Sequence, residues 1–590
     1  MLLLVALTLL PAAAQAQAIE AWVQRYNGPA NGDDRAYCLA VDTNGNVCVT
    51  GASYIGPQEG DQALATIKYS SAGAPLWTNF YGPENYQDNA LVVAVDAIGN
   101  VFVAGKSGGL LTIKYSSTGT GLWTNRYSAA SAGVSLAVDA SGNLLVTGGG
   151  PGGCSTVKYS SGGALLWART YSLGLPGYFP EMKGVMALDA SGNVVVTGNS
   201  GDGPDYLTVK YSSAGALLWT NRYNGPGNGW DRYTQVAVDA SGNVFVTGES
   251  DGPNLSSDNR DYATIKYSSA GLALWTNRYN GPVNSGDGAK AIVADAFGNV
   301  YVTGWSYSGI GDDYLTIKYS SAGVPLWTNR YNGPGNGNDV PSAVAVDASG
   351  NVYVTGSSGG DYATIAYSSA GMPLWTNRYN GPANYGDQPH ALALDPNANV
   401  YVTGMSANTT TYPYGHDYAT VKYVTPPIIT RQPLSRTNLA GTTASFTVEA
   451  VGGVPLSYQW RRGGTNLLDG GNLSGVSTTN LLIANVQLAD VAGYSVVVTN
   501  AHGNVTSSVA QLTVIVSPGR FSNLSYSPET GFSFLFHDAT LGRPYRIQIS
   551  PSPAEGSWTD WLSFTYIGPI GISDRSAPDA ERRFYRAVSP

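Results

Sequence analysis

The sequence predicts an all-β protein, and three observations lead to this: its composition, an internal repeat and the residues inside that repeat. The chain has 590 residues, with 74 glycines, 12% charged residues and 11% aromatic residues. Helical bundles and coiled coils need many Glu, Lys, Leu and Ala residues, and disordered chains are poor in aromatic residues. The composition therefore excludes both classes.

Four short motifs each occur eight times between residues 20 and 425. They are variants of AVAVD, NVYVTG, TIKYSS and LWTNRY, and they recur about every 50 residues. Each motif is rich in β-branched or aromatic residues and is bounded by Gly, Ser, Asn or Asp, which is typical of short strands. The tryptophans of the LWTNRY variants are Trp22, Trp77, Trp123, Trp167, Trp219, Trp275, Trp327 and Trp375.

Turn residues connect these predicted strands into meanders. The link DASGN, as at 347–351, places Asp at the first turn position and Gly where a left-handed backbone is needed. The link between TIKY and LWTNRY, as at 320–325, is equally short and also contains Gly. Each repeat is therefore predicted to be a four-stranded antiparallel meander, and eight successive meanders indicate a β-propeller.

The order of the motifs predicts how such a ring closes. The first motif, at 22–26, is an isolated LWTNRY strand, and the last, at 418–423, is a TIKY strand with no LWTNRY after it. A closed ring removes the exposed edges that a flat array of sheets would have. We therefore expect residues 19–425 to form an eight-bladed β-propeller closed by the N-terminal strand.

The GNVYVTG motif preceded by AVAVD resembles the bacterial β-propeller repeat family of the SBBP type, over about residues 20–425. The resemblance implies the fold but no single activity, and the family name suggests seven blades where the motifs here count eight. A second motif, YSSAGxxLW, is similar to the tryptophan-docking motif of pyrroloquinoline-quinone dehydrogenases, which are also eight-bladed. Those enzymes usually carry an adjacent cysteine pair, which this chain lacks.

The C-terminal third of the chain changes character. Residues 428–516 resemble a bacterial immunoglobulin-like (I-set-like) β-sandwich, in which Trp460 would be the core tryptophan and Tyr494 the tyrosine corner. Val448 and Val496 take the places of the usual disulfide. Residues 517–590 contain alternating aromatic strands split by Pro and Gly, and they are predicted to form a small C-terminal β-module.

The N-terminal segment 1–18 is apolar and ends in small residues, so it is predicted to be a secretory signal peptide cleaved after Ala16 or Ala18. The net charge of −9 argues against nucleic acid as a partner. No interior stretch reaches 18 apolar residues, so no transmembrane segment is expected. We expect a secreted or cell-surface monomer in which Cys38, Cys48 and Cys154 are free thiols.

Residues that recur from repeat to repeat are interpreted as scaffold. Each repeated tryptophan is expected to wedge between adjacent blades. The recurring Lys of TIKY, Arg of WTNRY and Asp before TIKY, such as Lys266, Arg278 and Asp261, are interpreted as ion pairs between neighbouring strands. The alternative is a ring of charge around a binding face. The Asp of AVAVD is interpreted as a turn residue.

Binding is expected on the face of the ring that carries the long, variable links, because variable loops on a fixed scaffold usually hold the binding site. Aromatic rings beside amides and carboxylates suit a glycan, and they equally suit a surface protein. The alternative is that the loop tips only pack on each other. The candidate ligand-binding residues are Tyr54, Tyr86, Tyr178, Trp230, Trp305, Tyr307, Tyr385, Tyr412 and Tyr414.

Metal and catalytic motifs give little support to an enzyme. No cofactor is expected, although the oxygen-rich loops 254–261 and 332–339 could hold structural calcium. The sequence has no P-loop, HExxH or GxSxG motif. The unrepeated carboxylates Asp202, Glu249 and Asp251 are the candidates for an acid pair in a carbohydrate-active enzyme.

The sequence therefore predicts a non-catalytic binding or adhesion protein that uses the long-loop face. Two alternatives stay open. One is a structural cell-envelope component without a discrete ligand, and the other is a polysaccharide-active or quinoprotein-like propeller enzyme.

Overall fold

The computed structural model describes residues 18–56, 61–82, 89–130, 135–150, 153–171, 185–199, 205–252, 260–409, 415–540, 542–554, 556–576 and 582–589. The chain divides into two compact units, Met1–Thr425 and Pro426–Pro590. Each unit is described by itself.

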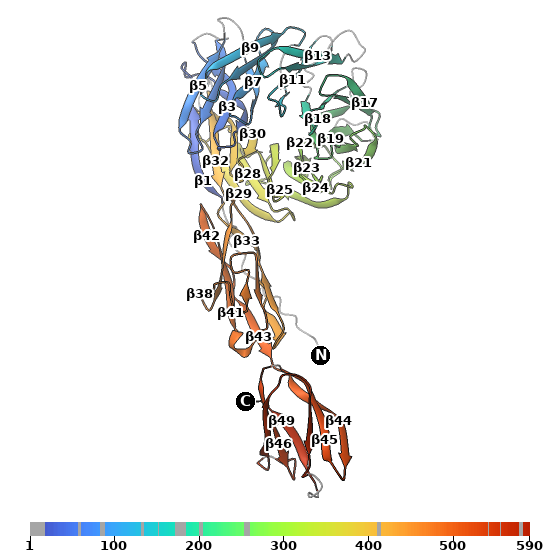
Figure 1. The fold of residues 1–590 in the computed structure, drawn as a ribbon. Helices are drawn as coiled ribbons and strands as arrows, with labels where there is room; N and C mark the ends of the chain where they lie inside the picture. Colours follow the sequence, from blue (N-terminus) through green and yellow to red (C-terminus); the bar gives the residue numbers. More distant parts are fainter. Residues whose placement is uncertain are drawn as a thin grey trace. The chain divides into compact units, whose positions relative to one another are not determined.

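The first unit consists of eight four-stranded antiparallel sheets, which we number 1 to 8 in chain order (Figure 1). Sheet 1 contains β2 (Arg35–Val41), β3 (Val47–Tyr54), β4 (Gln62–Tyr69) and β5 (Pro75–Tyr81). Sheet 2 contains β6 (Asn89–Val95), β7 (Val101–Lys106), β8 (Leu110–Tyr115) and β9 (Gly121–Tyr127), and sheet 3 contains β10 (Ser135–Val138), β11 (Leu144–Gly150), β12 (Gly153–Tyr159) and β13 (Leu165–Tyr171). Sheet 4 contains β14 (Val185–Leu188), β15 (Val194–Asn199), β16 (Tyr206–Tyr211) and β17 (Leu217–Tyr223).

Sheet 5 contains β18 (Asp231–Val238), β19 (Val244–Asp251), β20 (Arg260–Tyr267) and β21 (Ala273–Tyr279). Sheet 6 contains β22 (Asp287–Ala294), β23 (Val300–Tyr307), β24 (Asp312–Tyr319) and β25 (Pro325–Tyr331), and sheet 7 contains β26 (Asp339–Val346), β27 (Val352–Ser358), β28 (Asp361–Tyr367) and β29 (Pro373–Tyr379). Sheet 8 contains β30 (Gln388–Leu394), β31 (Val400–Ala407), β32 (His416–Val424) and β1 (Ile19–Tyr26). The predicted meander is therefore the repeating unit.

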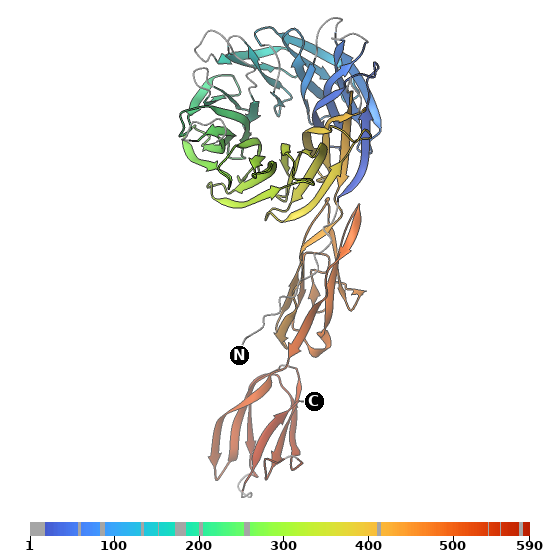
Figure 2. The ribbon, with the colours of Figure 1, turned by 180° about the vertical axis from the view of Figure 1, so that it is seen from behind.

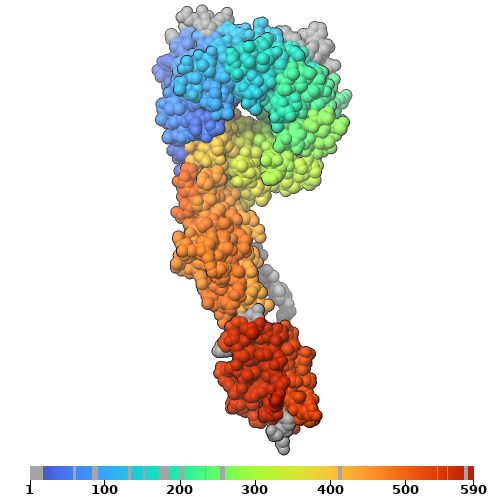
Figure 3. All heavy atoms as spheres, viewed as in Figure 1, coloured from blue at the N-terminus to red at the C-terminus, as the bar shows by residue number. Residues whose placement is uncertain are grey.

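The first strand of each sheet packs against the first strands of its two neighbours, so these strands form the inner side of the unit. Figure 2 shows the sheets following one another from blue to yellow, and Figure 3 shows the unit hollowed in its middle. The second and third strands are almost fully buried, whereas the fourth strand alternates between exposed and half-buried residues. The core therefore lies between successive sheets.

Six of the eight contacts between successive sheets use one repeated junction, in which a Lys and a Trp of one sheet donate to the same serine carbonyl of the next. Between sheets 5 and 6, the Lys266 ammonium and the Trp275 indole N–H both donate to the Ser321 carbonyl, at 2.8 and 3.3 Å. Gly323 has φ +84°, and a Cβ there would lie 2.8 Å from the Trp275 ring, so the tight turn needs glycine. The serine carbonyls that accept from both a Lys and a Trp are those of Ser71, Ser161, Ser213, Ser269, Ser321 and Ser369.

The expected tryptophan wedge is thus confirmed, although most of these rings are half-exposed because they lie on the outer strand. The expected Arg–Asp pairs are also confirmed. Arg278 of β21 lies 2.8 Å from Asp261 of β20, and Arg330 lies 2.9 Å from Asp313. The repeated charges therefore stabilise individual sheets.

The repeated lysine has a different ion-pair partner from the one expected. Lys68 of β4 pairs with Asp42, at the turn after β2, with 3.1 Å between Nζ and Oδ2 and both side chains only 3% exposed. Asp42 also holds its turn, because its Oδ1 accepts from the backbone N–H groups of Asn44 and Asn46. The Asp of AVAVD is therefore both a turn residue and the counter-ion of the buried lysine.

The two ends of the first unit share sheet 8, as expected. β1 pairs antiparallel with β32, and Arg25 of β1 lies 2.8 Å from Asp417 of β32. Trp22 of β1 and Lys422 of β32 donate to the Ser71 carbonyl of sheet 1, at 3.1 and 2.9 Å. Ala18 is buried and its carbonyl accepts from Asn377 of sheet 7, so Ala18 contacts the fold.

The second unit begins with an immunoglobulin-like arrangement of short strands. It contains β33 (Ile428–Arg431), β34 (Arg436–Leu439), β35 (Ala444–Thr447), β36 (Glu449–Val451), β37 (Ser457–Arg462), β38 (Thr465–Asn466), β39 (Leu473–Ser474), β40 (Asn480–Ile483), the 3-10 helix η1 (Leu488–Asp490), β41 (Ala492–Asn500), β42 (Gly503–Thr506) and β43 (Ala510–Ile515). Trp460 is fully buried in the core, together with Val448 and Val496. The Tyr494 hydroxyl donates to the Asp490 carbonyl at 2.8 Å, which confirms the tyrosine corner.

The remaining strands form two three-stranded sheets around an aromatic core. They are β44 (Pro518–Ser527), β45 (Gly531–Ala539), β46 (Pro544–Ser550), β47 (Thr559–Thr565), β48 (Ile570–Asp574) and β49 (Phe584–Val588). Phe536 and Tyr545 are fully buried between the sheets. These strands thus enclose an aromatic core of their own.

Deletion of Ile19–Tyr26 should lower the melting temperature of the first unit by at least about 5 °C, because β32 then loses its partner strand and Ser71 loses the Trp22 donor. Thermal unfolding followed by circular dichroism measures this. A matched chain that begins at Ala18 is the control. Equal melting temperatures for the two chains would contradict the role of β1.

Asp42→Asn should destabilise the first unit by about 3 kcal/mol at pH 7, because it leaves the buried Lys68 ammonium without its counter-ion. Burial alone would raise the pKa of Asp42, but hydrogen bonds from Asn46 and the Lys68 ammonium outweigh it and lower the pKa. A carboxyl with a lowered folded-state pKa stabilises the fold above its unfolded pKa, of about 3.9, and loses this effect as the pH falls through the folded pKa.

The destabilisation caused by Asp42→Asn should therefore become smaller as the pH falls below about 4. Urea unfolding at several pH values measures this change. Lys68→Met provides the control background, in which Asp42→Asn should cost less at pH 7. A cost that is the same at every pH and in both backgrounds would count against the ion pair.

Candidate ligand-binding face

The connections of variable length, which join the fourth strand to the next first strand and the second strand to the third, lie at one end of the strands. The short turns, such as the turn at Asp295–Asn299, lie at the other end. Of the predicted site residues, Tyr54, Trp230, Trp305, Tyr307 and Tyr385 are described by the structure. Four others lie outside the described residues: Tyr86, Tyr178, Tyr412 and Tyr414.

Trp230 is the most exposed of the five described aromatic candidates. It directly precedes β18, and 54% of it is exposed. Its backbone N–H donates to the Asp251 carboxylate at 2.7 Å, which fixes the loop. The Arg232 guanidinium lies 5.0 Å from the centre of the Trp230 ring, within the range of a cation–π contact.

An ion-pair network lies beside Trp230. Arg260 at the start of β20 lies 3.2 Å from Glu249 and 3.5 Å from Asp251, both near the end of β19. Lys290 of β22, in sheet 6, lies 3.6 Å from the other oxygen of Glu249. Glu249 and Asp251 are buried, whereas Lys290 is 37% exposed. The network therefore joins sheets 5 and 6 and presents cationic groups to solvent.

Trp305 reaches the same network from sheet 6. A Cβ at Gly288 would lie 2.5 Å from the Trp305 indole nitrogen and 2.8 Å from Oε1 of Glu249, so both side chains cover this glycine. Tyr307 ends the same strand, β23, and is half-buried. The structure thus brings Trp305 beside Glu249. Arg260, which contacts Glu249, also contacts Asp251, and Asp251 accepts from the backbone N–H of Trp230.

The remaining described candidates lie elsewhere. Tyr54 ends β3 in sheet 1 and is half-buried, and its side chain packs over Gly32 in the connection between β1 and β2. Tyr385 lies between β29 and β30 and is 51% exposed. Neither contacts the network of Glu249, Asp251, Arg260 and Lys290 in the interactions described.

A second polar cluster lies where sheets 1 and 8 meet. Asp33 is 2.7 Å from His416 of β32 and 2.6 Å from Arg35 of β2, and His390 of β30 stacks on Tyr37 of β2. Burial alone would raise the pKa of Asp33, but the hydrogen bonds from His416 and Arg35 outweigh it and lower the pKa. Burial lowers the pKa of His390, so this ring is neutral at neutral pH. The cluster joins the two sheets.

The oxygen-rich loop 332–339 uses its polar groups internally. Asn332 donates to Asn336 at 2.9 Å, and the Gly333 N–H donates to the buried Asp339 carboxylate at 2.6 Å. The same pattern recurs in other sheets, for example from Gly281 to Asp287. The other oxygen-rich loop, 254–261, lies mostly outside the described residues. Within the described ranges, no group of three or more His, Cys, Asp and Glu side chains could hold a metal ion.

The sequence pointed to Trp230, Trp305, Glu249 and Asp251 but gave no reason to select Arg232, Arg260 or Lys290. Their departure from the repeat is the only signal that could have identified them. The three cysteines are free, as expected. Where the structure describes the chain, no helix has the length and apolar character needed to cross a membrane.

Comparison with known proteins identifies two families in this chain. Residues 327–363 match the β-propeller repeat family, and residues 426–500 match the immunoglobulin domain family. A stretch of 91 residues is 37% identical to endoglucanase C of Cellulomonas fimi. This match covers 15% of the present chain and 8% of the endoglucanase, so the chain spans only a small part of that relative.

Solved structures of titin domains are also similar over a short region. In the complex of titin M10 with obscurin-like 1, the similar chain is 26% identical, with a TM-score of 0.15, over 15% of this chain and 95% of that chain. A chimeric titin Z1Z2 is 30% identical, with a TM-score of 0.14, over 16% of this chain and 96% of that chain. The two family matches show a β-propeller repeat at 327–363 followed by an immunoglobulin-like domain at 426–500.

Proposed function

We propose that this protein is a secreted or cell-surface polysaccharide-binding protein, and that Trp230 is the platform on which a sugar ring stacks. The observation that carries the proposal is the exposed indole of Trp230, held beside the Glu249–Asp251–Arg260–Lys290 network. A flat aromatic ring stacks on the apolar face of a sugar, and charged groups beside it fix the hydroxyls.

The proposed function is binding without catalysis. Hydrolysis of a glycosidic bond by two carboxyl groups needs them on either side of the bond. Glu249 and Asp251 are two residues apart on β19, and both face Arg260. Their charges are thus engaged in holding the loop, which supports a structural role for them at a binding site. Asp202 lies outside the described residues.

The architecture fits this proposal. We infer that the eight sheets act as one closed eight-bladed propeller, supported by the pairing of β1 with β32 and by the Trp22–Ser71 contact. The similarity to an endoglucanase, whose name describes action on glucans, supports a carbohydrate ligand.

Trp230→Ala should weaken retention of the protein in native gels that contain soluble β-glucan or xylan by at least about tenfold in apparent affinity. Loss of a central aromatic anchor costs on the order of 2 kcal/mol, and 1.4 kcal/mol is a factor of ten. Because the Trp230 side chain is exposed, the melting temperature should be unchanged.

Phe297→Ala is the matched control. Phe297 is 79% exposed but lies in a short turn at the opposite end of the strands, so its removal should leave retention unchanged. Equal retention of the wild type and both variants would contradict the site. No retention of the wild type in any polysaccharide gel would favour a protein ligand or a purely structural role.

A further inference from the structure

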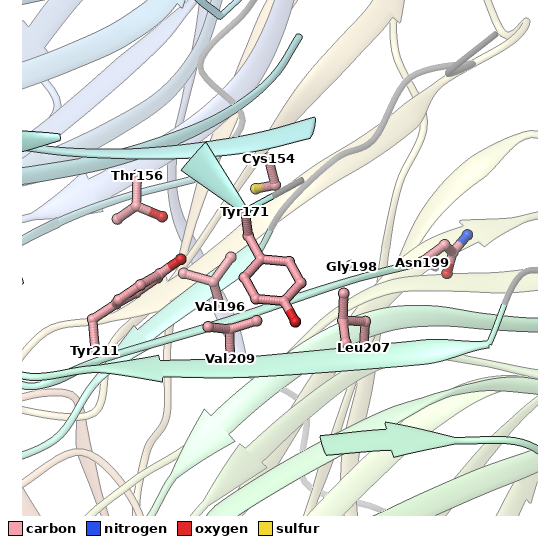
Figure 4. A pocket seen from close by; sticks show the side chains of 9 residues that line it. All are labelled: Cys154, Thr156, Tyr171, Val196, Gly198, Asn199, Leu207, Val209 and Tyr211. Atoms are coloured by element: carbon pink, nitrogen blue, oxygen red, sulfur yellow. The ribbon is translucent and has the colours of Figure 1, made fainter. Parts of the chain in front are cut away.

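The cavity between sheets 3 and 4 is too small for a sugar ring. Its walls include Cys154, Tyr171 and Tyr211 (Figure 4). Its volume is about 20 Å³, which leaves room for about one water molecule. This cavity therefore gives no sugar site, and selection among polysaccharides falls to the surface groups beside Trp230.

Arg232 is an exposed cation beside Trp230. It lies on β18, directly opposite Glu249 of β19 in the register of the sheet. Both oxygens of Glu249 are used by other cations, because Oε2 lies 3.2 Å from Arg260 and Oε1 lies 3.6 Å from Lys290. Among the described residues, no carboxylate forms an ion pair with Arg232. Its charge is therefore available to a ligand.

The contact between Arg232 and Trp230 leaves the donors of the guanidinium group available. A stacked guanidinium uses its flat face, and its N–H groups point outward in its plane, as a fork that fits a carboxylate. The guanidinium lies 5.0 Å from the centre of the indole and covers at most one face of it, and 54% of Trp230 is exposed. A sugar can therefore contact the indole while an acidic group on that sugar accepts from Arg232.

A β-bulge directs a second cation to the same place. The register between β22 and β23 shifts at Lys290, so Lys290 is the extra residue of the bulge, and its ammonium reaches Glu249 of sheet 5. The Lys290 side chain is 37% exposed, whereas those of Glu249 and Asp251 are 10% and 11% exposed. Asp312 of β24, which also lies near Lys290, is half-buried. The cations thus face solvent and the carboxylates are recessed.

Cations at the same height in sheets 1 and 2 lack this setting. Arg35 of sheet 1 takes the register position of Arg232, but it is paired with Asp33 at 2.6 Å. Lys106 of sheet 2 takes the register position of Glu249 and is exposed, but no described aromatic ring lies beneath its ammonium. The combination of an unpaired cation with an exposed indole is therefore a feature of the Trp230 site and not of the repeat.

We propose that the polysaccharide bound at Trp230 is acidic, and that a carboxylate or sulfate group of the bound sugar accepts from Arg232 while Lys290 adds a second positive charge. This inference rests on the proposed polysaccharide-binding function and adds the charge of the ligand to it. Charge-assisted hydrogen bonds are about twice as strong as neutral ones. Because the whole chain has a net charge of −9, attraction of a polyanion has to come from this local group of cations.

The test is calorimetric titration of the full chain, at one ionic strength, with polygalacturonate, with its uncharged methyl ester and with a sulfated galactan. We expect one of the two acidic polymers to bind at least about fivefold more tightly than the ester, and which of them does so distinguishes carboxylate from sulfate. Arg232→Gln should remove this preference. Lys106→Gln is the matched control, because it removes the same charge at the same height of sheet 2, and it should keep the preference.

Trp230→Ala separates this inference from the proposed function. If the ester binds as tightly as the acidic polymers and Trp230→Ala weakens the binding of all three, the polysaccharide site stands and the acidic ligand is refuted. If the wild type binds none of the polymers, the proposed function fails and the inference fails with it. Equal losses in Arg232→Gln and Lys106→Gln would indicate attraction by charge in general, which would also overturn the inference.

Discussion

The first unit depends on one interaction, the acceptance of two hydrogen bonds by a turn carbonyl of the next sheet. At Ser213 the donors are Lys158 and Trp167 of the preceding sheet, at 3.2 and 3.1 Å. The lysine is also held by its own sheet through Asp139, at 2.9 Å. Because a buried ammonium group needs both a counter-ion and hydrogen-bond acceptors, this arrangement fixes the distance between two sheets as well as their orientation.

Sheets 7 and 8 show what happens when the junction cannot form. The third and fourth strands of sheet 8 come from opposite ends of the first unit, so no turn connects them. Trp375 of sheet 7 is fully buried, and its indole nitrogen has no hydrogen-bond partner. Asn377 donates to the Ala18 carbonyl, whereas Asn329 of sheet 6 donates to the glycine of a turn. The N-terminal segment thus replaces part of the missing turn.

Much of this could be predicted from the sequence, because the repeat shows the same strand and turn chemistry eight times. The meander, the pairing of β1 with β32, and the Arg278–Asp261 type of ion pair follow from motif order and spacing. The Lys68–Asp42 pair does not, because Lys68 lies on β4 and Asp42 follows β2, so that β3 lies between their strands. Trp230 and Asp251 could be selected as unrepeated residues, but their hydrogen bond depends on how two loops fold.

The most direct measurement of this account is hydrogen exchange of the full chain, followed by mass spectrometry on peptides that cover β1 and β32. If the two ends share sheet 8 and the Ser71 junction fixes it to sheet 1, these peptides should exchange as slowly as those of β19 and β20 inside sheet 5. Exchange of the β1 peptide within seconds, while β19 and β20 remain protected, would contradict the account.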